Sequence, residues 1–257
     1  MKRIYPLKNA KTIMVFSLMV LILTSCGETE TLTVGVNSGY RPFGYVEEGK
    51  VKGFEIELWH EIAKEAGIRY KLKPLATGDL IKSVKDRKID AAIAGITVKD
   101  SRKKIADFST PYLYTGQTLL VRSDEQNING VKDLKDKVVA AKIGTTGYEY
   151  LTKVKGIKEI QAFPTIDEAF QALLERKVDA VIYDAPGIHH YTKNEGKGKT
   201  KAVGGELTKE HYSIAFPKGS RYTGKINNAL RAIGENGTFE RIYMKWFGEP
   251  PQSTPQS

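Results

Sequence analysis

One nine-residue phrase occurs twice in this chain and narrows the possible folds more than any other feature. "RKIDAAIAG" spans residues 87–95, and "RKVDAVIYD" spans residues 176–184. Each copy follows a predicted amphipathic helix that ends at the Arg-Lys pair. An aspartate then makes a turn into an apolar run typical of a buried strand. Since this is the order of a β-α-β unit, the sequence predicts two similarly built α/β lobes.

The segments around the two copies predict the rest of each lobe. Apolar runs predict strands at 31–37, 68–75, 89–96, 138–144, 157–163, 178–184 and 211–220, with a hairpin at 46–54. Helical spacing predicts helices at 55–66, 78–88, 145–154, 166–177, 186–194 and, as one long final helix, 223–247. Because strands alternate with helices over short loops, we expect parallel sheets covered on both faces.

The two copies also indicate where a ligand would bind. In open α/β sheets, ligands bind beyond the carboxyl ends of the strands. Gly95 and Asp184 lie at such ends, one at the close of each copy. If the lobes face each other, both residues point into the cleft between them.

The first 25 residues are typical of an export signal. Basic residues without an acid precede an apolar core at 12–23, which is too short to span a bilayer. The following "LTSC", residues 23–26, resembles a bacterial lipoprotein signal, in which Cys26 becomes the acylated N-terminus. The alternative is an ordinary secretory signal that happens to contain a cysteine. Either interpretation predicts export, with residues 26–30 as a short linker.

Composition excludes several other classes of protein. Cys26 is the only cysteine, so the exported domain has no internal disulfide and depends on its hydrophobic core. Without the four basic residues of the leader, 36 basic and 30 acidic residues remain, a net charge of +6. Because these charges are interspersed, they indicate a solvated surface and no nucleic-acid partner. The four histidines lack the spacing of metal ligands. Residues 249–257, without apolar anchors, predict a disordered tail.

A candidate anion site follows Gly95. The strand end leads through Thr97 to a helix predicted to start at Asp100, whose free amides and dipole favour an anion. Arg102 lies in the first turn of this helix, and its planar guanidinium can bind a carboxylate through two nitrogens. The alternative is that Arg102 belongs to a solvated run with the neighbouring lysines.

The second lobe offers a turn and an acid. Gly144, Thr145 and Thr146 form a tight turn from strand to helix, whose hydroxyls and amides can also hold an anion, although threonines there more often cap the helix. Asp184 either caps the following turn or is the partner of a buried cation. Together with Arg102 these groups match a small zwitterion, because either of its charges would be costly to bury unpaired.

Six stretches of the sequence resemble the polar amino-acid-binding proteins of bacterial ABC importers, most closely the glutamine-binding type. They are "PFGY…GFEIELWHEIAK", "AGITVKDSRKKIADFSTPY", "KDLKDKVVAAKIGTT", "VDAVIYDAP", "AFPKGS" and "ENGTFERIYMKWFG". The resemblance covers about 31–248 and implies a two-lobed periplasmic-binding-protein-like α/β fold of type II. It implies a discontinuous first lobe at 31–113 and 213–248, a second lobe at 114–212, and a hinge of two strands near 112–116 and 208–212.

The same resemblance implies roles for residues of both lobes. Arg102 would bind the ligand carboxylate, with Thr97 nearby and Thr146 at the turn that helps to hold it. The carbonyl of Gly95 and the carboxylate of Asp184 would bind the ammonium. The residues expected to bind ligand are Asn37, Tyr40, Thr77, Gly95, Thr97, Arg102, Lys142, Thr145, Thr146, Tyr183 and Asp184.

The departures from the family pattern fall on the pocket for the ligand side chain, of which Tyr40 would form a wall. Asn37 stands where many relatives carry an acid, Thr77 where glutamine binders carry an aromatic residue, and Tyr183 where they carry a histidine. Lys142 matches them. Because an uncharged Asn37 weakens the case for a cationic side chain, glutamine or another neutral polar amino acid is the first choice.

These residues predict a lipoprotein that captures a polar amino acid and delivers it to an ABC permease with its ATPase subunit. We expect a monomer without a cofactor, anchored through the lipid on Cys26 and facing the periplasm or the cell exterior. One alternative is an enzyme on the same scaffold, such as a cyclohexadienyl or arogenate dehydratase. Such an enzyme needs a general acid and no partner for an ammonium, so Asp184 beside Arg102 favours binding. The other alternative is a sensing domain for a signalling partner, which a lipoprotein signal without a further membrane segment disfavours.

Overall fold

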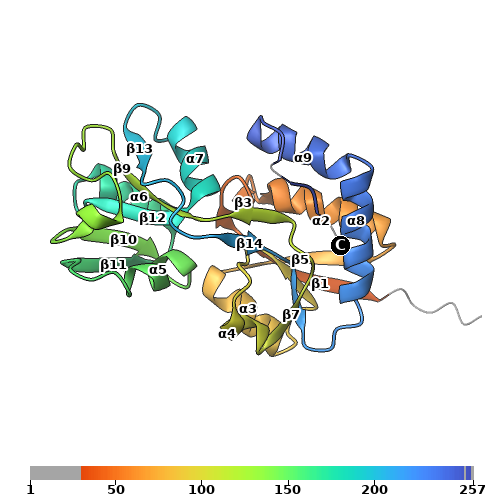
Figure 1. Cartoon of the computed structure of the whole chain (residues 1–257). Coiled ribbons are helices and arrows are strands. Elements are labelled where there is room, and N and C mark those ends of the chain that lie inside the picture. The colour runs from red at the N-terminus through yellow and green to blue at the C-terminus, as the bar shows by residue number, and fades with distance from the viewer. Residues whose placement is uncertain (1–29, 252, 256–257) are drawn as a thin grey trace, which may run out of the picture. The chain divides into compact units, whose positions relative to one another are not determined.

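The computed structural model describes residues 30–251 and 253–255. The predicted export signal, the predicted lipidation site Cys26 and the linker up to residue 29 lie outside these residues. From Thr31 on, the described residues form one compact unit. Figure 1 shows two lobes in it, one of orange and blue elements and one of green and cyan elements. The two-lobed α/β fold is therefore confirmed.

The first lobe is built on a five-stranded sheet in the order β5-β1-β6-β15-β7. Its strands are β1 (Thr31–Asn37), β5 (Arg69–Leu75), β6 (Ala91–Ile93), β7 (Ala106–Phe108) and β15 (Ala215–Pro217). Strand β1 runs parallel to β5 and β6, whereas β15 runs antiparallel to β6 and β7. A separate antiparallel sheet contains the predicted hairpin and consists of β2 (Gly39–Tyr40), β3 (Gly44–Glu47) and β4 (Lys50–Lys52).

The second lobe is built on a sheet in the order β11-β10-β12-β9-β13. Its strands are β9 (Gln117–Arg122), β10 (Val138–Lys142), β11 (Glu159–Phe163), β12 (Ala180–Asp184) and β13 (Thr200–Val203). Strand β10 runs parallel to β11 and β12, whereas β9 runs antiparallel to β12 and β13. The parallel pairing predicted for the β-α-β units is therefore present in each lobe, and the antiparallel strands β15, β9 and β13 make both sheets mixed.

The antiparallel strands arise where the chain crosses between the lobes. Strands β8 (Leu113–Thr115) and β14 (Glu210–Tyr212) pair with each other, with Tyr114 opposite His211, and form the predicted two-strand connection. Strand β9 follows β8 directly, and β15 follows β14, so each enters its sheet from the hinge side. The residue bounds of the two lobes stay a prediction.

Helices cover both sheets (Figure 1). They are α2 (Phe54–Glu65), α3 (Thr77–Lys85), α4 (Asp100–Lys103), α5 (Thr146–Leu151), α6 (Ile166–Leu174), α7 (Ala185–Lys193), α8 (Thr223–Glu235) and α9 (Thr238–Phe247), with a 3₁₀ turn at Val131–Leu134. In the first lobe the ring of Phe54 lies 5.2 to 6.0 Å from the rings of Phe239, Tyr243 and Phe247, so α9 is packed onto α2 by an aromatic cluster.

The two copies of the repeated phrase share one helix ending. Arg87 and Arg176 have φ angles of +53° and +59° and follow the ends of α3 and α6. A residue in this left-handed region stops a helix and turns the chain toward the sheet.

The aspartates of the phrase also have the same contacts. The backbone N–H of Thr33 donates to Oδ2 of Asp90, and that of Val138 donates to Oδ2 of Asp179, both at 2.8 Å. Each aspartate therefore ties the start of the buried strand to the first parallel strand of its own lobe.

Two helix predictions need correction. The long final helix is broken into α8 and α9, because Gly237 has a φ angle of +78°, which a continuous helix does not allow. The helix predicted at Asp100 is the single turn α4, so its dipole contributes little to an anion site.

The described part of the tail contacts α8. Pro255 is buried, and its carbonyl oxygen lies against Gly234, so close that a Cβ there would be 2.7 Å from it. The disorder expected for residues 249–257 stays a prediction. None of the helices in residues 30–251 and 253–255 has the length and apolar character that crossing a bilayer requires.

Candidate functional site

A small cavity between the two lobes is lined by all the residues predicted to bind ligand except Lys142. Its lining residues are Asn37, Tyr40, Thr77, Ala94, Gly95, Thr97, Arg102, Gly144, Thr145, Thr146, Tyr183 and Asp184. Gly95 and Asp184, the last residues of the two copies of the repeated phrase, therefore line the same cavity. The cavity volume is about 20 Å³, which is room for roughly one water molecule.

Arg102 reaches from the first lobe to the second. Its guanidinium donates from Nη1 to the carbonyl oxygen of Thr97 at 2.8 Å and from Nη2 to that of Gly144 at 3.5 Å. Burial lowers the pKa of Arg102, while nearby acids, Glu149 first, oppose that shift. The predicted alternative placed Arg102 in a solvated run with the neighbouring lysines. Lys103 is exposed, as in such a run, but Arg102 is half-buried.

Glu210, which the sequence analysis missed, connects the two threonines of the cavity. Its Oε2 accepts a hydrogen bond from the hydroxyl of Thr97 at 2.7 Å and another from that of Thr146 at 2.8 Å. Its Oε1 accepts from the hydroxyl of Thr208 at 2.9 Å. A carboxylate on a hinge strand thus holds one hydroxyl from each lobe. In the sequence, only the position of Glu210 inside the predicted hinge indicated a role at the cavity.

Asp184 ends β12 and faces the cavity. Its side chain forms no capping bond to α7, so the capping interpretation is wrong. Instead, Oδ1 accepts from Nε2 of Gln117 at 2.7 Å. Burial, followed by the charge of Glu210, raises the pKa of Asp184 to about 6, against the opposing hydrogen bonds of Tyr212 and Gln117 and the charge of Lys142.

Gly95 is held by a buried acid that the sequence analysis also missed. Its N–H donates to Oε1 of Glu55 at 2.6 Å, and the hydroxyl of Tyr112 donates to the same oxygen. Burial raises the pKa of Glu55 to about 7, although both hydrogen bonds oppose it. Gly95 has a φ angle of +60°, and a Cβ there would lie 2.7 Å from Cε1 of Tyr40. Only glycine fits this position without a shift of the tyrosine.

The predicted side-chain pocket contains two more pairs. Nδ2 of Asn37 donates to the hydroxyl of Thr77 at 2.9 Å. The hydroxyls of Tyr40 and Tyr212 are 2.9 Å apart, and the ring of Tyr183 lies edge-on to Tyr40 with centroids 5.4 Å apart. This wall is therefore aromatic and carries phenol hydroxyls.

The side chains of Lys142 and Tyr183 are buried and form no hydrogen bond with the residues that the structure describes. Lys142 is 4% exposed and Tyr183 is 2% exposed. Burial lowers the pKa of Lys142, and the charges of Asp184 and Asp167 act in the opposite direction. Among the described residues, Oε1 of Gln117 and Oε2 of Glu55 are fully buried polar atoms without a partner, and both side chains contact residues of the cavity.

Thr145 acts as the helix cap that the sequence analysis named as its alternative. Its oxygen accepts from the N–H of Tyr148 at 3.3 Å, and its hydroxyl donates to the carbonyl of Lys142 at 2.7 Å. The hydroxyl of Thr145 therefore bonds to the backbone, whereas that of Thr146 donates to Glu210 and accepts from the amide of Gln117.

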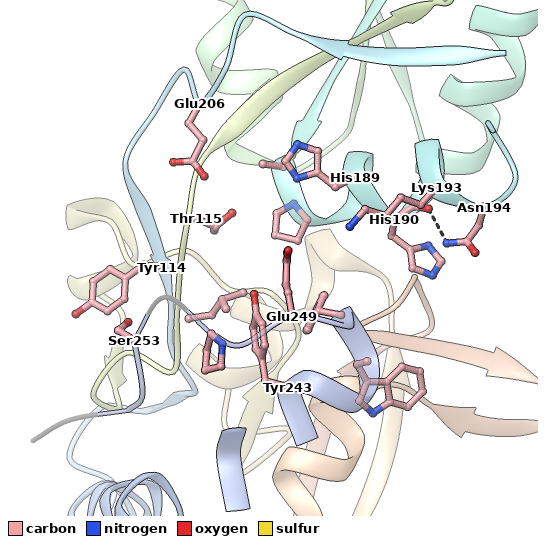
Figure 2. Close-up of a pocket in the computed structure, with 16 residues that line it drawn as sticks. Tyr114, Thr115, His189, His190, Lys193, Asn194, Glu206, Tyr243, Glu249 and Ser253 are labelled. Carbon is pink, nitrogen blue, oxygen red and sulfur yellow. Dashed lines mark hydrogen bonds between the residues drawn. The ribbon is translucent and has the colours of Figure 1, made fainter. Parts of the chain in front are cut away.

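A larger hollow of about 470 Å³ lies between α7 and the C-terminal segment (Figure 2). His189, His190 and Lys193 line it from α7, opposite Tyr243 and Glu249. None of the residues predicted to bind ligand lines it. Within the described ranges, no group of three or more histidine, cysteine or acidic residues could hold a metal ion.

Comparison with protein families gives one match across most of the chain. The model of "Bacterial extracellular solute-binding proteins, family 3" matches residues 32–249. A curated relative, the L-cystine-binding protein TcyJ of Escherichia coli K12, is 32% identical over 232 residues, which cover 88% of this chain and 86% of the relative.

Solved structures show the same similarity. The arginine-, lysine-, histidine-binding protein ArtJ of Geobacillus stearothermophilus has a TM-score of 0.82 and 33% identity, covering 87% of this chain and 97% of that one. An ancestral arginine-binding protein bound to glutamine has a TM-score of 0.80 and 39% identity, covering 85% and 98%.

Proposed function

This chain belongs to the bacterial extracellular solute-binding proteins, family 3, and on that basis we propose that it binds a polar amino acid between its lobes and delivers it to an ABC importer. The observation that carries the proposal is the small cavity, where Arg102 of one lobe and Asp184 of the other line the same space. A guanidinium and a carboxylate on opposite walls match the two charges of an amino-acid zwitterion.

The carboxylate of the ligand would bind to Arg102. Its guanidinium now donates to two carbonyl oxygens, and a bidentate carboxylate is a stronger acceptor than either. The hydroxyls of Thr97 and Thr146 donate to Glu210 in the structure. On binding, they would donate to the carboxylate of the ligand instead. The ammonium would bind to Asp184 and to the carbonyl of Gly95.

The side chain of the ligand would meet Lys142 together with neutral groups, among them Asn37, Thr77 and Tyr183. A buried ammonium repels a cationic side chain and donates to a carbonyl or amide oxygen. We therefore favour a neutral polar amino acid, with glutamine first. The relatives named above are described as binding cystine, arginine, lysine or histidine, or as bound to glutamine, so their names alone do not select one ligand.

Binding would work as a hinged clamp. Strands β8 and β14 connect the lobes, and the residues proposed to bind the ligand come from both lobes. A ligand that supplies opposite charges to the two walls stabilises the closed form more than the open form, which is what a ligand-driven closure requires.

We also propose that Cys26 is acylated and anchors the protein to a membrane, as a monomer that presents both lobes to the permease. Mass spectrometry of protein extracted from membranes with detergent tests the anchor. The N-terminal peptide of the wild type should carry a lipid at Cys26, and Cys26→Ala should leave the protein in the soluble fraction. A membrane-bound Cys26→Ala protein would contradict the anchor.

The binding proposal is tested by calorimetry with the twenty amino acids and cystine. At least one neutral polar amino acid should bind, and Arg102→Ala should weaken it by about a hundredfold or more, because it removes the charged partner of a buried carboxylate. Lys103→Ala, an exposed neighbour in the same turn, is the matched control and should keep wild-type affinity. Near-wild-type affinity of Arg102→Ala would refute the proposed carboxylate site, and turnover of prephenate or arogenate would show an enzyme instead.

A further inference from the structure

Glu55 does not line the small cavity, but it holds a residue that does. It lies in the first turn of α2, and its side chain is 0% exposed. Its Oε1 accepts both of its hydrogen bonds, from the N–H of Gly95 at 2.6 Å and from the hydroxyl of Tyr112. Its Oε2 is fully buried and has no hydrogen-bond partner among the described residues. Because buried polar atoms are normally paired, this carboxyl group calls for an explanation beyond helix stabilisation.

The groups around Glu55 provide hydrogen bonds but no positive charge. Burial raises the pKa of Glu55 to about 7, its two hydrogen bonds oppose the rise, and the charge of Asp184 adds to it. The other titratable groups that interact with Glu55 are the phenols of Tyr40, Tyr112 and Tyr183. None of these groups is a cation. A carboxylate is costly to bury in such surroundings, and a cation bound nearby would remove much of that cost.

The proposed function places a cation close to this acid. Gly95 and Asp184 both line the small cavity, and the ligand ammonium would bind to the carbonyl of Gly95 and the carboxylate of Asp184. The charge of Asp184 acts on Glu55, so the two acids are within electrostatic reach of each other. A cation beside Asp184 would therefore also act on Glu55, with the opposite sign.

Gly95 depends on Glu55 for its orientation. It has no side chain to pack, and its φ angle of +60° lies in the left-handed region. A hydrogen bond from its N–H to a carboxylate is stronger than a bond between neutral groups. The position of the carbonyl that would receive the ammonium is thus set by an acid on a different element, α2.

We propose that Glu55 is a positioning residue for the ligand ammonium, which fixes the backbone of Gly95 and supplies a second buried negative charge in addition to that of Asp184. This inference deepens the proposed function and rests on it. Glu55 acts through Gly95 and through its charge, without touching the ligand. Because an ammonium in the cavity favours the ionised form of Glu55, binding releases the proton of Glu55 to the solvent.

The test is calorimetry of the full chain with L-glutamine at pH 7. Titrations in two buffers that differ in ionisation enthalpy give the number of protons released on binding. A group with a pKa of about 7 is about half protonated at pH 7, so Glu55 should release up to about half a proton. Asp184, with a pKa of about 6, should add about a tenth of a proton.

Glu55→Gln is the decisive variant. It keeps the size of the side chain and an oxygen that can accept from Gly95 and Tyr112, but it does not ionise. Proton release at pH 7 should fall to about the tenth of a proton that Asp184 contributes. The affinity for glutamine at pH 8 should fall by about tenfold, because one of two negative charges near the ammonium is lost.

The matched control is Glu57→Gln, which changes another acid in the first turn of α2. Glu57 forms an ion pair with Lys245 and does not line the cavity. The variant should therefore have the proton release and the glutamine affinity of the wild type.

Tyr112→Phe tests the same idea in the opposite direction. It keeps Glu55 but removes the hydroxyl that donates to Oε1, a bond that lowers the pKa of Glu55. The pKa should consequently rise further, and binding at pH 7 should release more protons than in the wild type.

Equal proton release by Glu55→Gln and the wild type would overturn the inference, as would a Tyr112→Phe protein that releases no more protons than the wild type. Unchanged glutamine affinity of Arg102→Ala, in contrast, overturns the proposed function. The two failures are distinguishable, because Arg102 belongs to the proposed carboxylate site and Glu55 to the ammonium site.

Discussion

The amide of Gln117 donates a 2.7 Å hydrogen bond to the carboxylate of Asp184 from the neighbouring strand. This bond orients the carboxylate at the cavity without neutralising it, because an amide carries no charge. Burial nevertheless raises the pKa of Asp184 to about 6, because the hydrogen bond from Gln117 opposes that rise only in part. Two predictions depend on this pair.

Ligand affinity should fall as the pH falls below about 6. Only the ionised form of Asp184 pairs with an ammonium, so protonation of the free protein competes with the ligand and costs about tenfold in affinity per pH unit. Calorimetry between pH 5 and pH 8 measures this. A constant affinity over that range would argue against Asp184 as the ammonium partner.

Asp184→Asn should stabilise the protein in the absence of ligand at pH 7.5. A raised pKa means that the native state binds the proton more tightly than the unfolded state, so stability is lost as the pH rises toward about 6 and stays low above it. The neutral amide removes this penalty, which is on the order of 1–3 kcal/mol. Urea unfolding should show the gain at pH 7.5 and little of it below pH 4. The variant should bind no amino acid.

Glu210→Ala should loosen the protein measured without ligand. The change removes the acceptor shared by Thr97 and Thr146, one from each lobe. Small-angle scattering should therefore give a larger radius of gyration than for the wild type. Glu206→Ala, an exposed acid of the same connection, is the control. Unchanged scattering of Glu210→Ala would mean that this carboxylate does not hold the lobes together.

Lys142→Gln should shift ligand preference toward cationic amino acids. The buried ammonium repels a guanidinium, and its removal should raise the affinity for arginine relative to glutamine by about tenfold or more. Competition calorimetry measures the ratio. Lys135→Gln, an exposed lysine of the same lobe, should leave the ratio as it is.

Gly95→Ala should destabilise the protein by more than about 2 kcal/mol and abolish binding. The added methyl meets the ring of Tyr40 at 2.7 Å, in addition to the strain of a positive φ angle. Gly205→Ala is matched in φ, at +63°, but nothing lies within 4 Å of its Cβ, so it should show only the backbone strain of about 1 kcal/mol. Thermal unfolding compares the two. An equal loss of stability in both variants would mean that the ring of Tyr40 moves aside and that its contact with the added methyl costs nothing.

The sequence predicts those parts of the fold that depend on local pattern. The repeated phrase predicts the buried strands β6 and β12, because helix, turn and strand follow one another within a few residues. It also predicts that the carboxyl ends of these two strands lie at one site. Apolar spacing continues on both sides of Asn236-Gly237 and predicts one helix, whereas the positive φ angle of Gly237 separates α8 from α9. Strands β7, β9 and β13 have no counterpart among the predicted strands.

The part of the site that escaped prediction consists of groups whose partners are distant in sequence. Glu55 contacts Gly95 and Tyr112, and Glu210 contacts Thr97 and Thr146, across separations that no local pattern records. An acid in the first turn of a helix, such as Glu55, looks like ordinary stabilisation of the helix dipole. Only the packing of the lobe shows that it is buried.

A binding space no bigger than one water molecule has a consequence for the timing of capture. Under the proposed function, an amino acid would reach Arg102 and Asp184 only after the walls separate, because the space between them holds no more than about one water molecule. The residence time of a captured molecule is then governed by how often the walls part. A permease that pulls them apart would determine the moment of release, and the cargo would be protected from escape during the search for that permease.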